Sequence, residues 1–226
     1  MNSTQTPDWR NMPPEEIERR SFEIISEELG GTELSGAKLA VLKRVIHTTA
    51  DFEYAKTLYF SPEAVTIGMA ALRAGAHILT DTKMAEAGIN KTSLAKLGGM
   101  THCFMADEDV RIAAKREGIT RAAVSMGKAC GISEPLIIAV GNAPTALLRL
   151  RELILEKQIK PELIIGVPVG FVNVVESKAA IKALDIPCII AQGRKGGSTV
   201  AAAICNALLY QTEKFRGMTD VTIRLP

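Results

Sequence analysis

The histidine at position 47 is the side chain best suited to proton transfer in this 226-residue sequence, which contains three histidines. Two threonines and an aspartate follow it within four positions and can orient an imidazole. An imidazole titrates near pH ~6.5, so it can give up or take a proton at working pH. His77 and His102 lie at or in short apolar strands, where we expect residues of the core or its edge. No pair has metal-ligand spacing, so no metal site is expected.

Three turns rich in glycine each follow an apolar run that is typical of a buried strand. They cover residues 141–145 (GNAPT), 166–172 (GVPVGFV) and 192–198 (QGRKGGS). Ligands of open parallel sheets bind beyond the carboxyl ends of the strands, and helix N-termini there suit anions. Arg194 and Lys195 add positive charge to the third turn. The pattern predicts an anionic ligand at one edge of a sheet, although glycine and proline also simply make tight turns.

A fourth candidate is residues 80–84 (TDTKM), at the end of an earlier strand, where Asp81 is either a helix cap or a ligand contact. Motifs of several other enzyme classes are missing. Neither GxxxxGK[ST] nor a GxGxxG after a strand occurs, so nothing supports a nucleotide. GxSxG is also missing, which argues against a serine nucleophile.

The elements that must position these residues alternate between strands and helices. Such alternation predicts βαβ units and a mostly parallel sheet flanked by helices, in a single α/β domain covering residues 1–226. Residues 1–12 read as a flexible or docking arm. Helices are expected at 14–29, 35–46, from 61 to about 75, 107–116, 120–130, 144–158, 174–184 and 198–215, and strands at 77–80, 100–104, 135–140, 162–165 and 187–191. His47 then falls at or just past the end of a helix.

Composition predicts a soluble cytoplasmic protein. The hydrophobic fraction is 47%, and the net charge of +2 comes from interspersed basic and acidic residues, so no nucleic-acid footprint is seen. The N-terminal residues do not resemble a signal peptide, and no apolar stretch is long enough to span a membrane. The four cysteines form no CxxC pair and are expected as free thiols of the core in a reducing compartment.

Eight segments of the sequence resemble the precorrin-8X methylmutase family, also called cobalt-precorrin-8 methylmutases. They occur in the expected order between residues 18 and 198, and GNAPTAL and PVGFV with the His47 segment are the most specific. At Lys83 the family often has arginine, which keeps the charge but changes the geometry. The segments are ERRSF (18–22), RVIHTTAD (44–51), TDTKM (80–84), TR (120–121), GNAPTAL (141–147), PVGFV (168–172), ESK (176–178) and GRKGGS (193–198).

The resemblance implies an isomerase of cobalamin biosynthesis. Members of the family move a methyl group from C-11 to C-12 of precorrin-8 or its cobalt form, giving hydrogenobyrinic or cobyrinic acid by a 1,5-sigmatropic shift. The family histidine matches His47 and is thought to protonate the macrocycle near ring C. The resemblance further implies a homodimer with sites near the interface. We expect no cofactor and no metal ligand, because any cobalt is carried by the substrate.

The implied substrate is a tetrapyrrole ring with several carboxylates, which suits arginines and backbone amides. Two other functions stay open at this point: a non-catalytic corrinoid carrier, and a phosphate- or nucleotide-handling α/β enzyme. The expected substrate contacts are Arg20, Ser21, Asp81, Lys83, Arg121, Gly141, Asn142, Gly170, Phe171, Arg194, Gly197 and Ser198.

Overall fold

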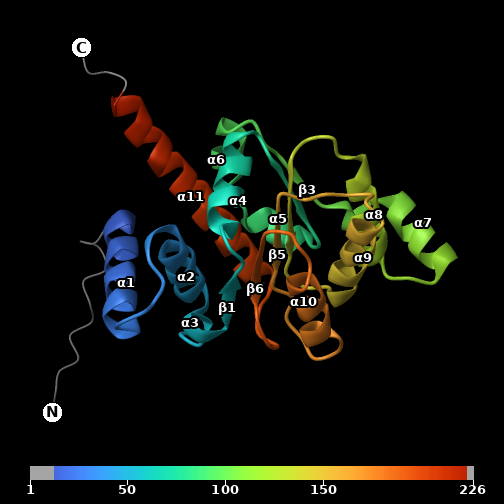
Figure 1. Cartoon of the computed structure of the whole chain (residues 1–226), viewed down its shortest axis with the longest axis horizontal. Helices are drawn as coiled ribbons and strands as arrows, with labels where there is room; N and C mark the ends of the chain where they lie inside the picture. Colours follow the sequence, from blue (N-terminus) through green and yellow to red (C-terminus); the bar gives the residue numbers. More distant parts are fainter. Residues whose placement is uncertain (1–12, 223–226) are drawn as a thin grey trace.

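A six-stranded sheet forms the middle layer of the computed structural model, which describes the backbone of residues 13–222 and the side chains of residues 13–214 (Figure 1). The strand order is β1-β6-β5-β4-β2-β3, and every neighbouring pair is parallel except β1 with β6. The predicted mostly parallel sheet is therefore confirmed. The strands are β1 (Leu58–Phe60), β2 (His77–Thr80), β3 (Thr101–His102), β4 (Leu136–Val140), β5 (Leu163–Gly166) and β6 (Cys188–Ala191).

The central strands are apolar throughout because helices cover both faces of the sheet. In β4, Ile137 and Ala139 face one core, while Leu136, Ile138 and Val140 face the other. All five side chains are buried, as the period-2 alternation of a strand requires when neither face meets water.

Two helical layers complete the fold. One core joins the sheet to α2 (Gly36–Thr49), α4 (Ala64–Arg73), α5 (Lys83–Gly88), α6 (Lys91–Lys96) and α11 (Ser198–Thr222). The other joins it to α8 (Arg121–Lys128), α9 (Pro144–Leu155) and α10 (Val174–Lys182). Outside these layers, α1 (Pro14–Leu29) packs on α2, and α7 (Glu108–Glu117) packs on α8. The short α3 (Tyr54–Thr57) leads into β1.

Several boundaries differ from the expected ones. The helix α2 runs on to Thr49, past its expected end at residue 46, so His47 lies in its last turn. The helix α4 starts at Ala64, because the Ser61 hydroxyl does not cap it but accepts a hydrogen bond from the Cys188 N–H. The strand β1 and the helices α3, α5 and α6 were not predicted. The expected arm of residues 1–12 lies outside the described residues.

The strand order creates a switch point between β2 and β4. From β2 the chain moves outward to β3, whereas from β4 it moves the opposite way through β5 to β6. In open parallel sheets, ligands enter a crevice at such a point, beyond the carboxyl ends of the strands. Residues 80–84 and 141–145 flank this crevice.

Candidate active site

His47 is an exposed side chain anchored on a buried helix. Its neighbours Val45 and Ile46 are fully buried, which fixes the rotation of α2 and turns His47 outward. The helix ends at once because Ala50 adopts a left-handed conformation with φ of 52° and donates its N–H to the Ile46 carbonyl at 2.7 Å. The imidazole is thus accessible to a ligand.

Two side chains of α1 hold the His47 ring. The Ser21 hydroxyl lies 2.8 Å from Nδ1, and the Phe22 ring stacks on the imidazole with a centroid distance of 5.2 Å and an interplanar angle of 14°. The Arg44 guanidinium also lies over the Phe22 ring, 4.7 Å from its centroid. A hydroxyl can donate or accept, so Ser21 can bond Nδ1 in either protonation state. The nitrogen left for a ligand is Nε2.

His47 lies between two hollows of the surface. One, of about 360 Å³, runs between α1 and α2 and is mostly apolar. The other, of about 260 Å³, lies against α5 and the first turns of α11. His47 lines both hollows, and Ser21 lines the first. That second hollow is lined by Arg44, His47, Thr48, Gly88, Thr199, Ala202, Ala203, Asn206 and Tyr210.

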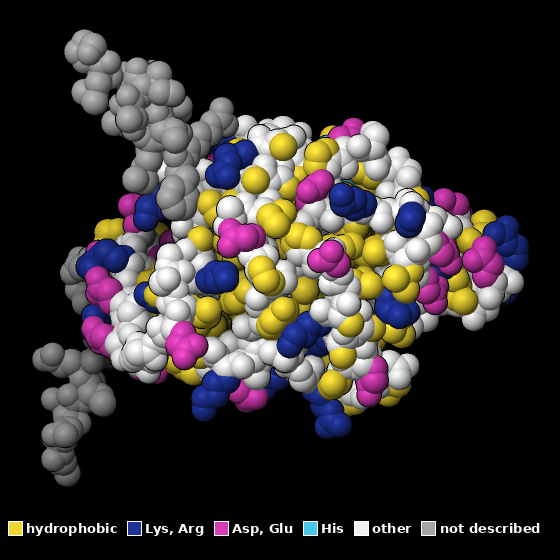
Figure 2. Space-filling model, viewed as in Figure 1, with side chains coloured by type: hydrophobic (Ala, Val, Ile, Leu, Met, Phe, Trp, Pro, Cys, Tyr) yellow, Lys and Arg dark blue, Asp and Glu magenta, His cyan; other side chains and the backbone are white. Residues whose placement is uncertain are grey.

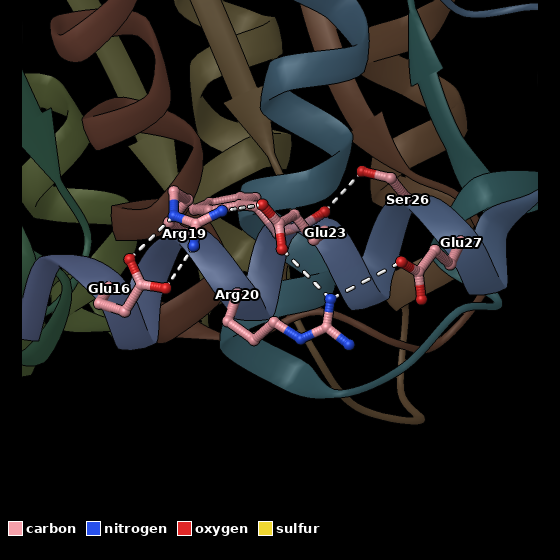
Figure 3. Close-up of polar contacts among 7 residues, drawn as sticks. Glu16, Arg19, Arg20, Glu23, Ser26 and Glu27 are labelled. Carbon is pink, nitrogen blue, oxygen red and sulfur yellow. Dashed lines mark hydrogen bonds and ion pairs between the residues drawn. The ribbon is translucent and has the colours of Figure 1, made fainter. Parts of the chain in front are cut away.

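Arg20 points along the surface of α1 beside the first hollow. Its guanidinium lies 3.2 Å from a carboxylate oxygen of Glu23 and 3.7 Å from one of Glu27 (Figure 3). The side chain is half exposed, so these pairs are weak. A substrate carboxylate would have to replace them.

The crevice at the switch point is already filled by a side chain of the protein. Asp81 is fully buried, and its carboxylate accepts the backbone N–H groups of Gly141, Asn142 and Ala143 at 2.9, 2.8 and 2.7 Å. Burial raises the pKa of Asp81, while these three donors act in the opposite direction. Asp81 and Gly141, both among the expected substrate contacts, are therefore hydrogen-bond partners of each other within the chain. Asp81 is not a helix cap; Thr82 caps α5.

The third glycine turn packs directly against the first two. The Ser198 hydroxyl lies 2.8 Å from that of Thr82, and the Gly197 N–H donates to the Val167 carbonyl at 2.9 Å. The polar groups of Gly197 and Ser198 that we expected to meet a substrate thus have partners within the chain. The same holds for the Gly170 N–H, which donates to the Arg194 carbonyl at 3.1 Å.

Lys195 links this turn to the helix that carries His47. Its ammonium lies 2.6 Å from carboxylate oxygens of both Asp51 and Glu53, just past the end of α2. These bonds raise the pKa of Lys195, and the bond from Lys195 lowers the pKa of Asp51. The expectation that Lys195 adds charge for a ligand is corrected: its charge is balanced within the chain.

Arg194, in contrast, is exposed and forms no ion pair with the described residues. Its guanidinium lies over the Phe171 ring at 5.5 Å. Phe171 is itself 82% exposed, and Val172 beside it is 77% exposed. This corner of the sheet edge therefore offers an apolar surface with a positive charge on it.

The remaining predicted contacts are spread along the same edge. Asn142 is exposed, although its backbone N–H donates to Asp81. Lys83, at the start of α5, pairs with Glu86 at 3.0 Å. Arg121 is exposed on the first turn of α8, where Thr120 contacts Thr145 of α9 at 2.8 Å. Figure 1 places α8 and α2 on opposite sides of the sheet, so one chain does not bring Arg121 to His47.

Lys178 is a polar residue of this region that the predicted contacts omitted. It is only 2% exposed and donates to two backbone carbonyls of the third glycine turn. Burial lowers the pKa of its ammonium to about 8. Its position in the ESK segment could have indicated a role, but a lysine in a helix is usually exposed to solvent and was not expected to be buried.

Metal and membrane features are absent from the part of the chain that the structure describes. No three histidine, cysteine, aspartate or glutamate side chains gather there in a way that could hold a metal ion. No helix of the described residues is long and apolar enough to cross a bilayer. Figure 2 shows basic and acidic side chains interspersed on the face in view, with hydrophobic ones gathered near its middle.

Comparison with known proteins gives consistent matches over most of the chain. A cobalt-precorrin-8 methylmutase of Priestia megaterium is 45% identical over 195 residues, covering 86% of this chain and 87% of the relative. One of Salmonella typhimurium is 46% identical over 203 residues, covering 87% and 95%. A crystal structure of precorrin-8x methyl mutase from Thermus thermophilus superposes with a TM-score of 0.81 at 39% identity, covering 88% of this chain and 98% of that one.

The family model described as precorrin-8X methylmutase matches residues 16–211. This range contains His47 and all twelve predicted substrate contacts. The chain belongs to the precorrin-8X methylmutase family.

Proposed function

We propose that this protein moves a methyl group from C-11 to C-12 of precorrin-8, or of its cobalt form, as an isomerase of cobalamin biosynthesis. The observation that carries the proposal is the state of His47 in a chain of this family: the side chain is exposed, Ser21 holds Nδ1, and none of the described residues forms a hydrogen bond with Nε2. The relatives are named for this reaction.

The proton moves in a closed cycle. Nε2 of His47 gives a proton to the macrocycle near ring C, the bond from the methyl group to C-11 breaks as the bond to C-12 forms, and the proton then returns to Nε2. Because substrate and product are isomers, the return keeps atoms and charge balanced. Nδ1 keeps its proton while Nε2 gives up and takes back its own, so the Ser21 hydroxyl accepts from Nδ1 and keeps the ring oriented through the whole cycle.

The carboxylates of the ring need positive groups around this acid. Arg194 is the best placed, since it is exposed and lies on the turn that Lys195 ties to the end of α2. Phe171 and Val172 beside it offer apolar contact for the macrocycle. Asn142 and Lys83 contribute polar groups from the neighbouring turns.

The site is incomplete in one chain, which supports a homodimer. The hollows beside His47 measure about 360 and 260 Å³. Pockets for drug-sized ligands span roughly 300–1,000 Å³, and a corrin ring with its side chains is larger than such ligands. The helix α8, which carries Arg121, packs on the opposite face of the sheet from α2, which carries His47 (Figure 1). A second copy that brings its Arg121 to the first copy's His47 would supply both the missing wall and the missing charge.

The reaction as proposed needs neither a resident cofactor nor a second substrate, because the methyl group stays within one molecule. Any cobalt would arrive inside the ring. We assign the protein to the cytoplasm on the reducing environment that its free cysteines suit; three of them are buried and Cys130 is exposed.

The test is conversion of precorrin-8 by the purified protein, followed by the change in the absorption spectrum. His47→Asn should lower turnover about 10²- to 10⁴-fold, the usual contribution of one general acid. The variant should keep its melting temperature and bind the ring product about as well as wild type. Lys38→Asn, on the same helix and outside the site, is the control and should retain activity. A loss under about threefold for His47→Asn would remove His47 from this role, and wild type that binds the ring without turnover would refute the isomerase.

A further inference from the structure

Two backbone carbonyls of the third glycine turn point at one buried lysine. Nζ of Lys178 donates to the carbonyl oxygen of Gly193 at 2.9 Å and to that of Lys195 at 2.8 Å. No carboxylate of the described residues forms an ion pair with Lys178, and only burial shifts its pKa. A buried ammonium without a counter-charge is costly, so these two bonds are what stabilises it.

The direction of the two carbonyls fixes the direction of the next two amides. The described residues contain no cis peptide bond. In a trans peptide unit, the C=O and the following N–H point in opposite directions. The N–H groups of Arg194 and Gly196 therefore point away from Lys178; Arg194 is an exposed residue, and Gly196 is half-buried. Neither donates to an acceptor within the described residues.

The side chain and carbonyl of Arg194 are also held. Its carbonyl accepts the Gly170 N–H at 3.1 Å, and its guanidinium rests over the Phe171 ring. Stacking on a ring leaves the N–H edges of a guanidinium free to meet a carboxylate. One short segment thus carries two amides that face away from Lys178 and an exposed guanidinium.

We propose that the N–H groups of Arg194 and Gly196, together with the Arg194 guanidinium, form a carboxylate-binding site. Lys178 is its positioning residue, because it holds the carbonyls of Gly193 and Lys195 and thereby orients the two N–H groups. A carboxylate accepts several hydrogen bonds at once and binds most strongly to charged donors. In the proposed function, which this inference takes as given, the ligand is one carboxylate of the corrin ring.

Lys178→Met tests the positioning role, because methionine fills the space but donates nothing. The dissociation constant of the ring product hydrogenobyrinic acid, measured by spectral titration, should rise about tenfold, the equivalent of one charged hydrogen bond. Turnover at saturation should change by less than about threefold, since the contact persists through the reaction. Lys160→Met, at an exposed position before β5, is the control and should bind the ring as wild type does.

A double-mutant cycle separates positioning from general stability. If Lys178 acts through the turn, Arg194→Ala should weaken binding less in the Lys178→Met background than in wild type. Fully additive effects, or a Lys178→Met variant that binds the ring as tightly as wild type, would overturn the proposal.

Hydrogen exchange on the unmodified protein gives an answer even if the variant fails to fold. The amides of Arg194 and Gly196 should exchange rapidly in the free protein and slow by about tenfold or more when the ring product is bound, because bonded amides are protected. Unchanged exchange at both amides in the complex would overturn the site. Failure of wild type to bind the ring at all would instead refute the proposed function.

Discussion

Replacing Gly141 by alanine tests how closely the glycine turns approach each other. A Cβ atom at this position would lie 2.7 Å from the Ser198 Cα, 2.8 Å from the Ser198 nitrogen and 2.8 Å from the Gly197 carbonyl oxygen. Optimal separation between carbon atoms is about 3.5–4.0 Å. All three neighbours are backbone atoms, so no side chain can rotate away, and the two turns must separate by about 1 Å.

The size of the effect follows from that separation. Overpacking a tight site costs typically ~1–3 kcal/mol. In a chain of this length, 1 kcal/mol shifts Tm by about 2–4 °C, so Gly141→Ala should lower Tm by roughly 2–12 °C. Turnover should fall by up to about 100-fold, since a displacement near 1 Å can cost that much even away from the reacting atoms.

Thermal unfolding followed by circular dichroism, with turnover measured on the same preparations, decides the matter. Gly127→Ala is the control, because it makes the same change inside α8, where an added Cβ meets nothing within 4 Å. Alanine is favoured over glycine in a helix by about 1 kcal/mol, so this variant should melt about 2–4 °C higher. If Gly141→Ala melted with wild type and kept full turnover, the close packing of these turns would be refuted.

Three further predictions concern charge. Arg194→Ala should raise the dissociation constant of the ring product about tenfold with little change in turnover; intact binding with a large fall in turnover would contradict this. The pKa of Lys178 is about 8 in the folded protein, against ~10.5 for a free lysine. Between these pH values the unfolded state binds more protons than the folded state. The free energy of unfolding should therefore rise with pH over this range, by at most about 3 kcal/mol. Urea unfolding at several pH values measures this rise, and Lys178→Met should lack it. Burial and then His77 lower the pKa of His102, so stability should drop as pH falls through about 6.5, and His102→Asn should flatten that drop.

The sheet could be predicted wherever the sequence carried a strong periodic or apolar signal. The strand β2 matches its predicted bounds, and β4, β5 and β6 differ from theirs by one residue at one or both ends. The strand β1 was missed because Leu58–Phe60 is too short to show alternation and is recognised only by its pairing with β6. Short helices such as α5 and α6 likewise have too few turns to build a periodic pattern.

From the sequence, the candidate site could be assigned to the carboxyl edge of the sheet, but its individual contacts could not. His47 and Arg194 are exposed at or beside the carboxyl edge, as expected. Asp81 and Ser198 also lie there but bond to neighbouring turns, and no local pattern distinguishes such a partner from a ligand. Lys178 was missed because its two acceptors are carbonyls 15 and 17 positions away, brought to it only by the fold.

The direction of the short strand β1 determines at which rim of the sheet His47 lies. Because β1 runs antiparallel to β6, its first residue Leu58 pairs with Ala191 at the end of that strand, and Thr57 accepts the Gln192 N–H. The polypeptide coming from α2 thus enters the sheet where the parallel strands leave it. If β1 ran the other way, its entry point would shift by the strand's length, about 10 Å, to the opposite rim. Reversing three residues would then place the imidazole at the opposite rim from the glycine turns, where we propose that the ring binds.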